Sequence, residues 1–132
     1  MGSFYVQTER ITLLSFMVAI PMGALSCAIL TVNNIRDLEK DKVAGKRTFA
    51  VRVGDLKARR IYVSLLILAH IAAVATFIPA TLLTLIAAPL TFSVSKVVLS
   101  QASGASLIPV LGRTGKLQLL FATLFAIALA IQ

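Results

Sequence analysis

Charged residues divide the sequence into long apolar blocks. Asp, Glu, Lys and Arg are absent from 11–35, 61–95, 97–112 and 117–132. The first block contains an apolar stretch over 11–32. As a helix this stretch would rise about 33 Å, which is enough to cross a hydrocarbon core of roughly 30 Å. The pattern therefore predicts a first transmembrane helix over 11–32.

The later blocks predict three further spans. The second block is too long for one crossing and suits two, with Pro79 at the hairpin between helices over 61–78 and 80–95. The last block, 117–132, has 16 residues, and Gly115 before it supplies a start for the helix. On length alone this segment is either a tilted span or a buried helix.

Composition agrees with a membrane protein. The chain has 132 residues, of which 58% are hydrophobic and 14% are charged, and its mean hydropathy is +0.94. So few charges could not cover the surface of an ordinary soluble domain, and disorder needs the opposite composition. We therefore expect one all-α, polytopic membrane domain over 1–132, with about four transmembrane helices.

The basic residues predict the orientation of this domain. The net charge is +8, and nine of the 13 Lys and Arg residues lie in 33–60, three in 96–116, and one at Arg10. Because Lys and Arg collect in cytoplasmic loops, both segments are expected on the cytoplasmic side of the cell membrane, with the two ends of the chain opposite. Binding of nucleic acid is not expected, since the only aromatic residue in 33–60 is Phe49.

The segment 33–60 also contains four of the five acidic residues. Asn33, Asp37, Asp41 and Gly45 recur every four residues, so a helix continuing out of the first span would place two carboxylates and an amide on one face. Two carboxylates at that spacing repel each other unless a cation lies between them. Oxygen ligands with no nearby Cys or His favour Mg²⁺ over zinc, and protein-bound Mg²⁺ is often shared with a phosphate.

Two basic residues follow this face directly. Lys46 and Arg47 come after Gly45, where the chain is expected to leave the helix, and they could contact the oxygens of a diphosphate. The alternative is a solvated basic loop that sets topology and touches anionic lipid, as in a lipid-binding or assembly module without catalytic activity. Spacing alone leaves both interpretations open.

The stretch 33–54 reads NNIRDLEKDKVAGKRTFAVRVG. It resembles the second aspartate-rich motif of the UbiA superfamily of intramembrane prenyltransferases. It is most similar to the branch that prenylates 1,4-dihydroxy-2-naphthoate in menaquinone synthesis, whose version reads N-N-x-R-D-x-x-x-D-x-x-x-G-K-x-T-L-A-V-R-L-G. The match is specific across 4–60, and from residue 61 onward it rests on helix count and on the Ala-Arg-Arg sequence at 58–60.

The resemblance implies roles for six residues, the first two as catalytic Mg²⁺ ligands and the other four as substrate-binding groups: Asp37 and Asp41, then Asn33, Arg36, Lys46 and Arg47. The implied reaction is metal-assisted loss of diphosphate from a polyprenyl diphosphate to give an allylic cation. The 1,4-dihydroxy-2-naphthoate ring attacks this cation and loses its carboxylate, which leads to demethylmenaquinone. Another aromatic quinone precursor, such as a hydroxybenzoate, is the alternative acceptor.

The chain departs from the family in size. Full members have about nine spans and two aspartate-rich motifs, whereas this sequence offers about four spans and one motif, and 1–32 contains no Asp. It resembles the C-terminal half of a UbiA-type bundle. The resemblance therefore implies that this chain alone is inactive and needs the N-terminal half, either as the rest of one polypeptide or as a complementary chain.

Three other polar residues have simpler expected roles. Asp55 precedes the second apolar block and is expected to cap the helix that follows. His70 lies inside the second predicted span and is expected to be a neutral side chain bonded to a neighbouring helix. Thr48 is either part of a turn or close to the diphosphate.

Overall fold

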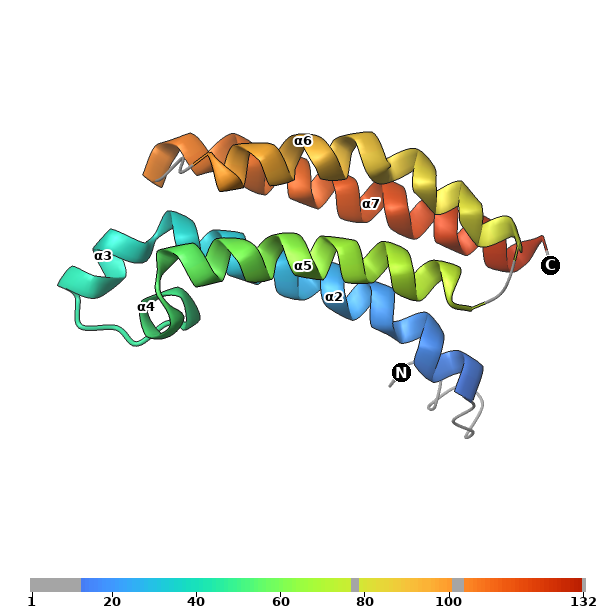
Figure 1. The fold of residues 1–132 in the computed structure, drawn as a ribbon, viewed down its shortest axis with the longest axis horizontal. Helices are drawn as coiled ribbons and strands as arrows, with labels where there is room; N and C mark the ends of the chain where they lie inside the picture. Colours follow the sequence, from blue (N-terminus) through green and yellow to red (C-terminus); the bar gives the residue numbers. More distant parts are fainter. Residues whose placement is uncertain (1–12, 77–78, 101–103, 132) are drawn as a thin grey trace.

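All regular secondary structure in the described part of the chain is helical. The computed structural model describes residues 13–76, 79–100 and 104–131. Its elements are α2 (Leu13–Arg36), α3 (Leu38–Val43), α4 (Phe49–Val53), α5 (Asp55–Val74), the 3₁₀ helix η1 (Pro79–Ala87), α6 (Ala88–Leu99), the 3₁₀ helix η2 (Gly104–Leu107) and α7 (Ile108–Ala130). Figure 1 shows these helices in two layers, with α2 beside α5 and α6 beside α7. The predicted all-α class is confirmed.

Three described segments are long and apolar enough to cross a membrane, and they are Ser15–Arg36, Leu82–Leu99 and Gly104–Ala130. The predicted span over 61–78 is not among them. Its helix, α5, begins earlier, at Asp55, and carries Asp55, Lys57, Arg59 and Arg60 in its first two turns. The uncharged remainder, 61–74, would rise only about 21 Å against a hydrocarbon core of roughly 30 Å.

The predicted boundaries of the second segment between spans, 96–116, differ from those in the structure. Lys96 lies in the last turn of α6, and α7 already begins at Ile108, so Gly115 does not start the final helix. Pro109 lies in the first turn of α7, where a missing N–H costs no intrahelical hydrogen bond. Within 96–116, residues 101–103 lie outside the described part of the chain, and Gly104–Leu107 forms η2.

The segment 33–60 is largely helical as well. Helix α2 extends through it to Arg36, α3 and α4 follow, and α5 begins before it ends. The expected continuation of the first helix is therefore present, and the cytoplasmic position of this segment stays a prediction. The chain leaves α5 through a turn at Ala75 and Thr76, and η1 begins at Pro79, the residue predicted for the hairpin.

Small residues bring the first layer together. Helices α2 and α5 form the most extensive helix pair. Ala28 on α2 and Ala58, Ala69 and Ala73 on α5 are fully buried in the core. Small side chains let the backbones of membrane helices approach closely, which increases van der Waals contact where lipid provides no hydrophobic drive. The pair therefore forms a stable base for α3, which continues from the end of α2.

Polar and aromatic contacts join the two layers. The buried hydroxyls of Tyr62 on α5 and Thr114 on α7 lie 2.7 Å apart. Because Thr114 donates its single hydrogen to Val110 O, Tyr62 is the donor. The His70 ring lies edge-on to Phe121 of α7 at 5.2 Å, but its hydrogen-bonding Nδ1 faces Leu66 O of its own helix at 3.0 Å. The expected hydrogen bond from His70 to a neighbouring helix was wrong.

Candidate metal and diphosphate site

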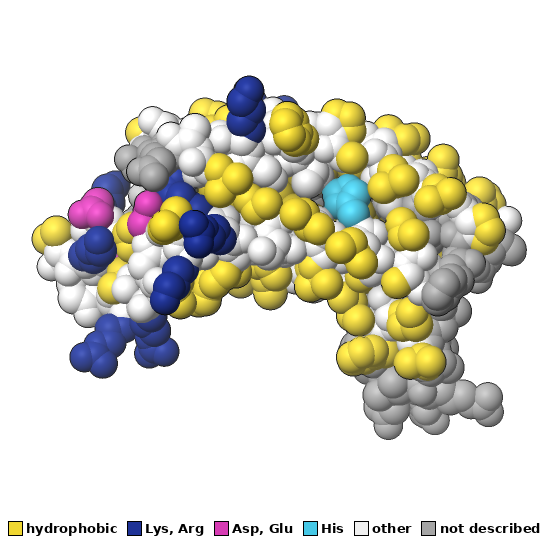
Figure 2. Space-filling view, viewed as in Figure 1, with side chains coloured by type: hydrophobic (Ala, Val, Ile, Leu, Met, Phe, Trp, Pro, Cys, Tyr) yellow, Lys and Arg dark blue, Asp and Glu magenta, His cyan; other side chains and the backbone are white. Residues whose placement is uncertain are grey.

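Charged side chains gather at one end of the molecule, where α3, α4 and the first turns of α5 meet. Figure 2 shows Lys, Arg, Asp and Glu concentrated there, while apolar side chains cover much of the remaining visible face. We call residues 33–60 the basic end. This segregation matches the division of the sequence into apolar blocks and charged segments.

The predicted four-residue repeat lies on nearly continuous helix. The Asp37 N–H donates to Asn33 O at 3.2 Å, and the Asp41 N–H donates to Asp37 O at 2.8 Å. Asp37 is the only residue between α2 and α3, and its backbone (φ −93°, ψ 6°) lies outside the regular helical region, although both of these hydrogen bonds have the four-residue spacing of a helix. Asn33, Asp37 and Asp41 are therefore stacked at one-turn intervals, as the spacing predicts.

The repeat ends at a glycine-specific turn. Gly45 has a φ of +73°, its N–H donates to Lys42 O at 3.2 Å, and the Lys46 N–H donates to Asp41 O at 2.9 Å. This pair of bonds is the Schellman motif, in which glycine takes the left-handed conformation directly after a helix. The motif thus fixes where Lys46 and Arg47 leave the helix, as expected from their place after Gly45.

Asp37 is paired with its neighbour. The Arg36 Nε and Nη2 atoms donate to the two Asp37 carboxylate oxygens, each at 2.9 Å. These hydrogen bonds, together with the charges of Arg36, Lys40 and Lys46, lower the pKa of Asp37 below its ordinary value. Asp37 is therefore a carboxylate at neutral pH, and each oxygen keeps a lone pair that Arg36 does not use.

Asp41 lies in different surroundings. It is 8% exposed, and its side chain makes no hydrogen bond or ion pair to the residues described here. Asn33 is half-buried one turn before Asp37. The described residues contain no cluster of three or more His, Cys, Asp or Glu side chains able to hold a metal. Two carboxylates and an amide still fit Mg²⁺, which commonly binds one or two protein carboxylates and completes its shell with water and phosphate.

Two adjoining cavities lie near the repeat, and Asp37 is the one residue of Asn33, Asp37 and Asp41 that lines either of them. The smaller, of about 240 Å³, is lined by Asp37, Arg36, Lys40, Gly104, Ala105 and Ile108. The larger, of about 420 Å³, shares Arg36, Lys40 and Gly104 with it and extends to Asp55 and Arg59. Both cavities therefore lie between the motif and the η2 end of the second layer.

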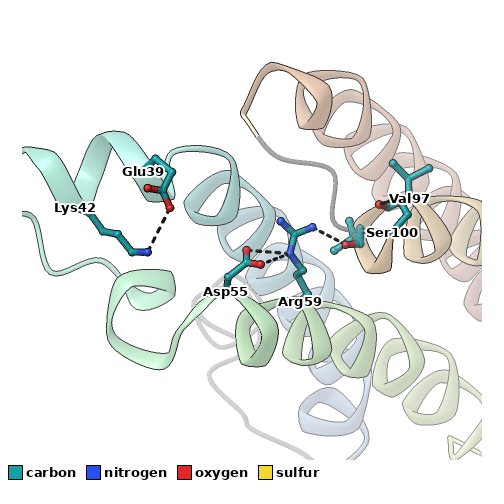
Figure 3. A network of polar contacts seen from close by, with 7 residues as sticks. Glu39, Lys42, Asp55, Arg59, Val97 and Ser100 are labelled. Atoms are coloured by element: carbon teal, nitrogen blue, oxygen red, sulfur yellow. Dashed lines mark hydrogen bonds and ion pairs between the residues drawn. The ribbon is translucent and has the colours of Figure 1, made fainter.

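An ion pair at the start of α5 forms one wall of the larger cavity (Figure 3). The Arg59 Nε lies 2.9 Å from both Asp55 carboxylate oxygens, and the Arg59 Nη1 donates to Val98 O on α6 at 2.6 Å. The Arg59 side chain is only 3% exposed. The expectation that Asp55 caps α5 was wrong: Gly54 holds the cap position, and the Asp55 carboxylate binds Arg59 instead.

Three residues of this site had no predicted role, and they are Lys40, Arg59 and Gly104. The four-residue spacing of Asp55 and Arg59 is nevertheless a recognisable ion-pair pattern. Lys46 and Arg47 are exposed beyond the end of α3, and Lys46 acts on Asp37 through its charge. The buried Thr48 hydroxyl oxygen has no hydrogen-bond partner in the described chain, so its expected role stays a prediction.

Comparison with known proteins gives the family of this chain. Residues 1–107 match the UbiA prenyltransferase family. The chain belongs to this family. UbiA proteins are integral membrane proteins and generally use Mg²⁺. The matched residues include the whole basic end and all the residues named as lining the two cavities except Ile108.

Relatives with assigned names extend the comparison. The chain is 40% identical over 135 residues to 1,4-dihydroxy-2-naphthoate octaprenyltransferase of Mycobacterium tuberculosis, covering 98% of this chain and 45% of the relative. It is 33% identical to the protein of that name from Escherichia coli, covering 98% and 44%. Human UbiA prenyltransferase domain-containing protein 1 is 33% identical, covering 91% and 35%. The chain therefore spans less than half the length of these relatives. No solved structure matches it.

Proposed function

We propose that this chain supplies the second aspartate-rich motif of a Mg²⁺-dependent membrane enzyme. The enzyme transfers a polyprenyl group from an allylic diphosphate to 1,4-dihydroxy-2-naphthoate. The names of the bacterial relatives support this acceptor. The observation that carries the proposal is the helical stacking of Asn33, Asp37 and Asp41, with Asp37 held as a carboxylate by Arg36.

The motif residues divide the binding of the charged substrate between them. Asp37 and Asp41 would hold Mg²⁺ with help from Asn33, and the bound metal would neutralise charge on the diphosphate. Lys46 and Arg47 follow the Gly45 turn and neutralise the remaining charge as the diphosphate leaves. Arg36 keeps Asp37 ionised and lines the adjoining cavity. Fixed charges of this kind stabilise a departing anion well in a site that excludes water.

The bond changes balance without an external oxidant. The allylic C–O bond breaks, and the diphosphate leaves with the electron pair. The acceptor ring carbon that bears the carboxylate forms the new C–C bond to the prenyl group. Loss of carbon dioxide returns its bonding electron pair to the ring, which gives the prenylated hydroquinone. The motif residues are therefore needed for departure of the anion.

The proposal also places the chain in the cell membrane. The three candidate spans, with α5 as a shorter fourth crossing, would put the basic end on the cytoplasmic side, among lipid headgroups. Activity would require a complementary stretch that carries a first aspartate-rich motif, because this chain covers less than half of its named relatives. Turnover by the 132-residue chain alone would contradict this requirement.

The proposal is tested by replacing each carboxylate of the motif with its amide. In the assembly that contains both motifs, Asp37→Asn and Asp41→Asn should each lower Mg²⁺-dependent prenyl transfer by about 100-fold or more, the loss typical when electrostatic stabilisation is removed. The control is Glu39→Gln, because it also replaces a carboxylate with the amide of the same length. Glu39 lies on α3 with Asp41, and its ion pair among the described residues is with the exposed Lys42, at 3.3 Å.

Turnover with prenyl diphosphate and 1,4-dihydroxy-2-naphthoate is measured for all four proteins. The proposal predicts a much smaller loss of turnover for Glu39→Gln than for either Asp variant, because Glu39 lines the larger cavity but is not a proposed metal ligand. Equal losses in the three variants, or full activity in both Asp variants, would exclude the proposed role and favour a membrane module without catalytic activity.

A further inference from the structure

The larger cavity beside the motif combines apolar walls with charged ones, in which basic residues outnumber acidic ones. Its volume of about 420 Å³ lies within the range of roughly 300–1,000 Å³ usual for small-molecule sites. The buried side chains of Ile35 and Leu38 contribute to its lining. The charged lining residues include Lys40 and two ion pairs, Glu39 with Lys42 and Asp55 with Arg59. The diphosphate group of the donor gains nothing from the apolar wall, and its prenyl chain gains nothing from Lys40. This combination instead suits a flat aromatic molecule that carries an anionic group.

The basic residues of this cavity differ in whether they form ion pairs. Arg36 is bound to Asp37, Lys42 to Glu39 and Arg59 to Asp55. Lys40 makes no ion pair or side-chain hydrogen bond within the described residues. It lines the larger cavity and also the smaller one that contains Asp37. Lys40 is therefore the cation positioned to bind a second anion beside the diphosphate.

Arg59 has a positioning role in the same cavity. Its guanidinium binds Asp55 on its own helix and Val98 O on α6, so it fixes the distance between the two layers at this wall. Its third nitrogen, Nη2, makes no hydrogen bond to a described residue, and Figure 3 shows one amino group of Arg59 without a partner. Arg59 thus holds the wall in place, and its Nη2 can still donate hydrogen bonds to a ligand.

We propose that this cavity binds the aromatic acceptor, with its ring against Ile35 and Leu38 and its carboxylate on Lys40, while Arg59 positions the wall. This inference rests on the proposed function and assigns the acceptor a place. Because the two cavities share Lys40, Arg36 and Gly104, an acceptor held here lies next to the diphosphate. An exposed lysine is suited to a carboxylate that later leaves as carbon dioxide, since tight ground-state binding would raise the barrier to its loss.

The test measures binding of two probes to the protein in lipid nanodiscs, together with any polypeptide that co-purifies with it. The probes are 1-hydroxy-2-naphthoate, which carries the carboxylate, and 1-naphthol, which lacks it. Equilibrium dialysis against empty nanodiscs corrects for partition into lipid. Lys40→Gln should weaken binding of the naphthoate by about fivefold, the upper range for an exposed ion pair, and leave naphthol binding unchanged.

Lys57→Gln is the matched control, because Lys57 is exposed at the start of α5 and does not line the cavity. It should leave binding of both probes unchanged. Arg59→Gln should weaken both probes, since it alters the wall rather than the carboxylate contact. Equal effects of Lys40→Gln and Lys57→Gln on the naphthoate, no effect of Lys40→Gln, or equal effects of Lys40→Gln on both probes would each overturn the inference.

Binding of farnesyl diphosphate with Mg²⁺ to the same samples separates this inference from the proposed function. Loss of farnesyl diphosphate binding in Asp37→Asn, with the naphthoate still sensitive to Lys40→Gln, supports two distinct sites. If the wild type does not bind farnesyl diphosphate but Lys40→Gln still weakens the naphthoate selectively, the proposed function fails and the aryl carboxylate site stands. If the wild type binds farnesyl diphosphate and Asp37→Asn does not, but Lys40→Gln leaves naphthoate binding unchanged, the aryl carboxylate site is overturned and the proposed function stands.

Discussion

The basic end and the apolar helix bodies are held by different kinds of contact. In the basic end, ion pairs join residues close in sequence, such as Arg36 with Asp37 and Asp55 with Arg59. In the helix bodies, buried apolar side chains from α2, α5 and α7 pack together, and isolated polar contacts such as Tyr62 with Thr114 cross between layers. Local pairing can therefore shape the site, while long-range packing supports it.

Arg59 connects the two regions, and its removal should have the largest effect on stability. Arg59→Gln removes a nearly buried guanidinium that binds both Asp55 and Val98 O. Hydrogen bonds to charged groups contribute about 1.5–3 kcal/mol each, so we expect the free energy of unfolding to fall by about 2–4 kcal/mol. Arg60→Gln changes the exposed neighbouring arginine and should have little effect. Similar losses in both variants would show that Arg59 does not join the layers.

A substitution at Gly45 tests the basic end alone. Gly45→Ala places a side chain at a φ of +73°, where the left-handed conformation costs about 1–2 kcal/mol. The control is Gly23→Ala inside α2, where a Cβ would meet no atom within 4 Å and helix propensity favours alanine. Thermal unfolding should show a loss for Gly45→Ala and none for Gly23→Ala. Unchanged stability of Gly45→Ala would indicate that the turn after α3 does not need glycine.

Acid should weaken the basic end slightly. The hydrogen bonds from Arg36 lower the pKa of Asp37 below its ordinary value of 3.8, so folding favours the ionised carboxylate. This contribution is present above that ordinary value and is lost as the pH falls through the lower folded-state pKa. The effect should be small, because the Asp37 side chain is 32% exposed. Between pH 6 and pH 3 the melting temperature should fall further in the wild type than in Asp37→Asn. An equal fall in both proteins would show that the ionised Asp37 carboxylate does not stabilise the fold.

The same division explains what the sequence could predict. The repeat of Asn33, Asp37 and Asp41 depends only on helical spacing, and the turn at Gly45 depends on local backbone preference, so both were predicted correctly. The spans over 11–32 and 80–95 also lie largely within α2 and η1–α6. Each of these features is encoded within a few consecutive turns of chain.

Features that depend on distant contacts were missed. Val98 and Gly104 reach the cavity region only because α6 and η2 pack against the first layer, and no local pattern marks them. Asp55 was expected to cap its helix because the sequence does not show that Arg59 would compete for the carboxylate. Helix α7 begins at Ile108 despite Arg113 and Lys116, since long basic side chains can reach the interface from within a helix.

Binding of Mn²⁺ as a substitute for Mg²⁺ tests the central assignment most directly. Electron paramagnetic resonance of Mn²⁺ should show a protein-bound ion in the presence of farnesyl diphosphate, in the wild type and in Glu39→Gln. Asp37→Asn and Asp41→Asn should each lose this signal, because each removes one of the two proposed carboxylate ligands. A bound Mn²⁺ signal that survives in both Asp variants, or that is lost in Glu39→Gln, would contradict the assignment of the metal site to Asp37 and Asp41.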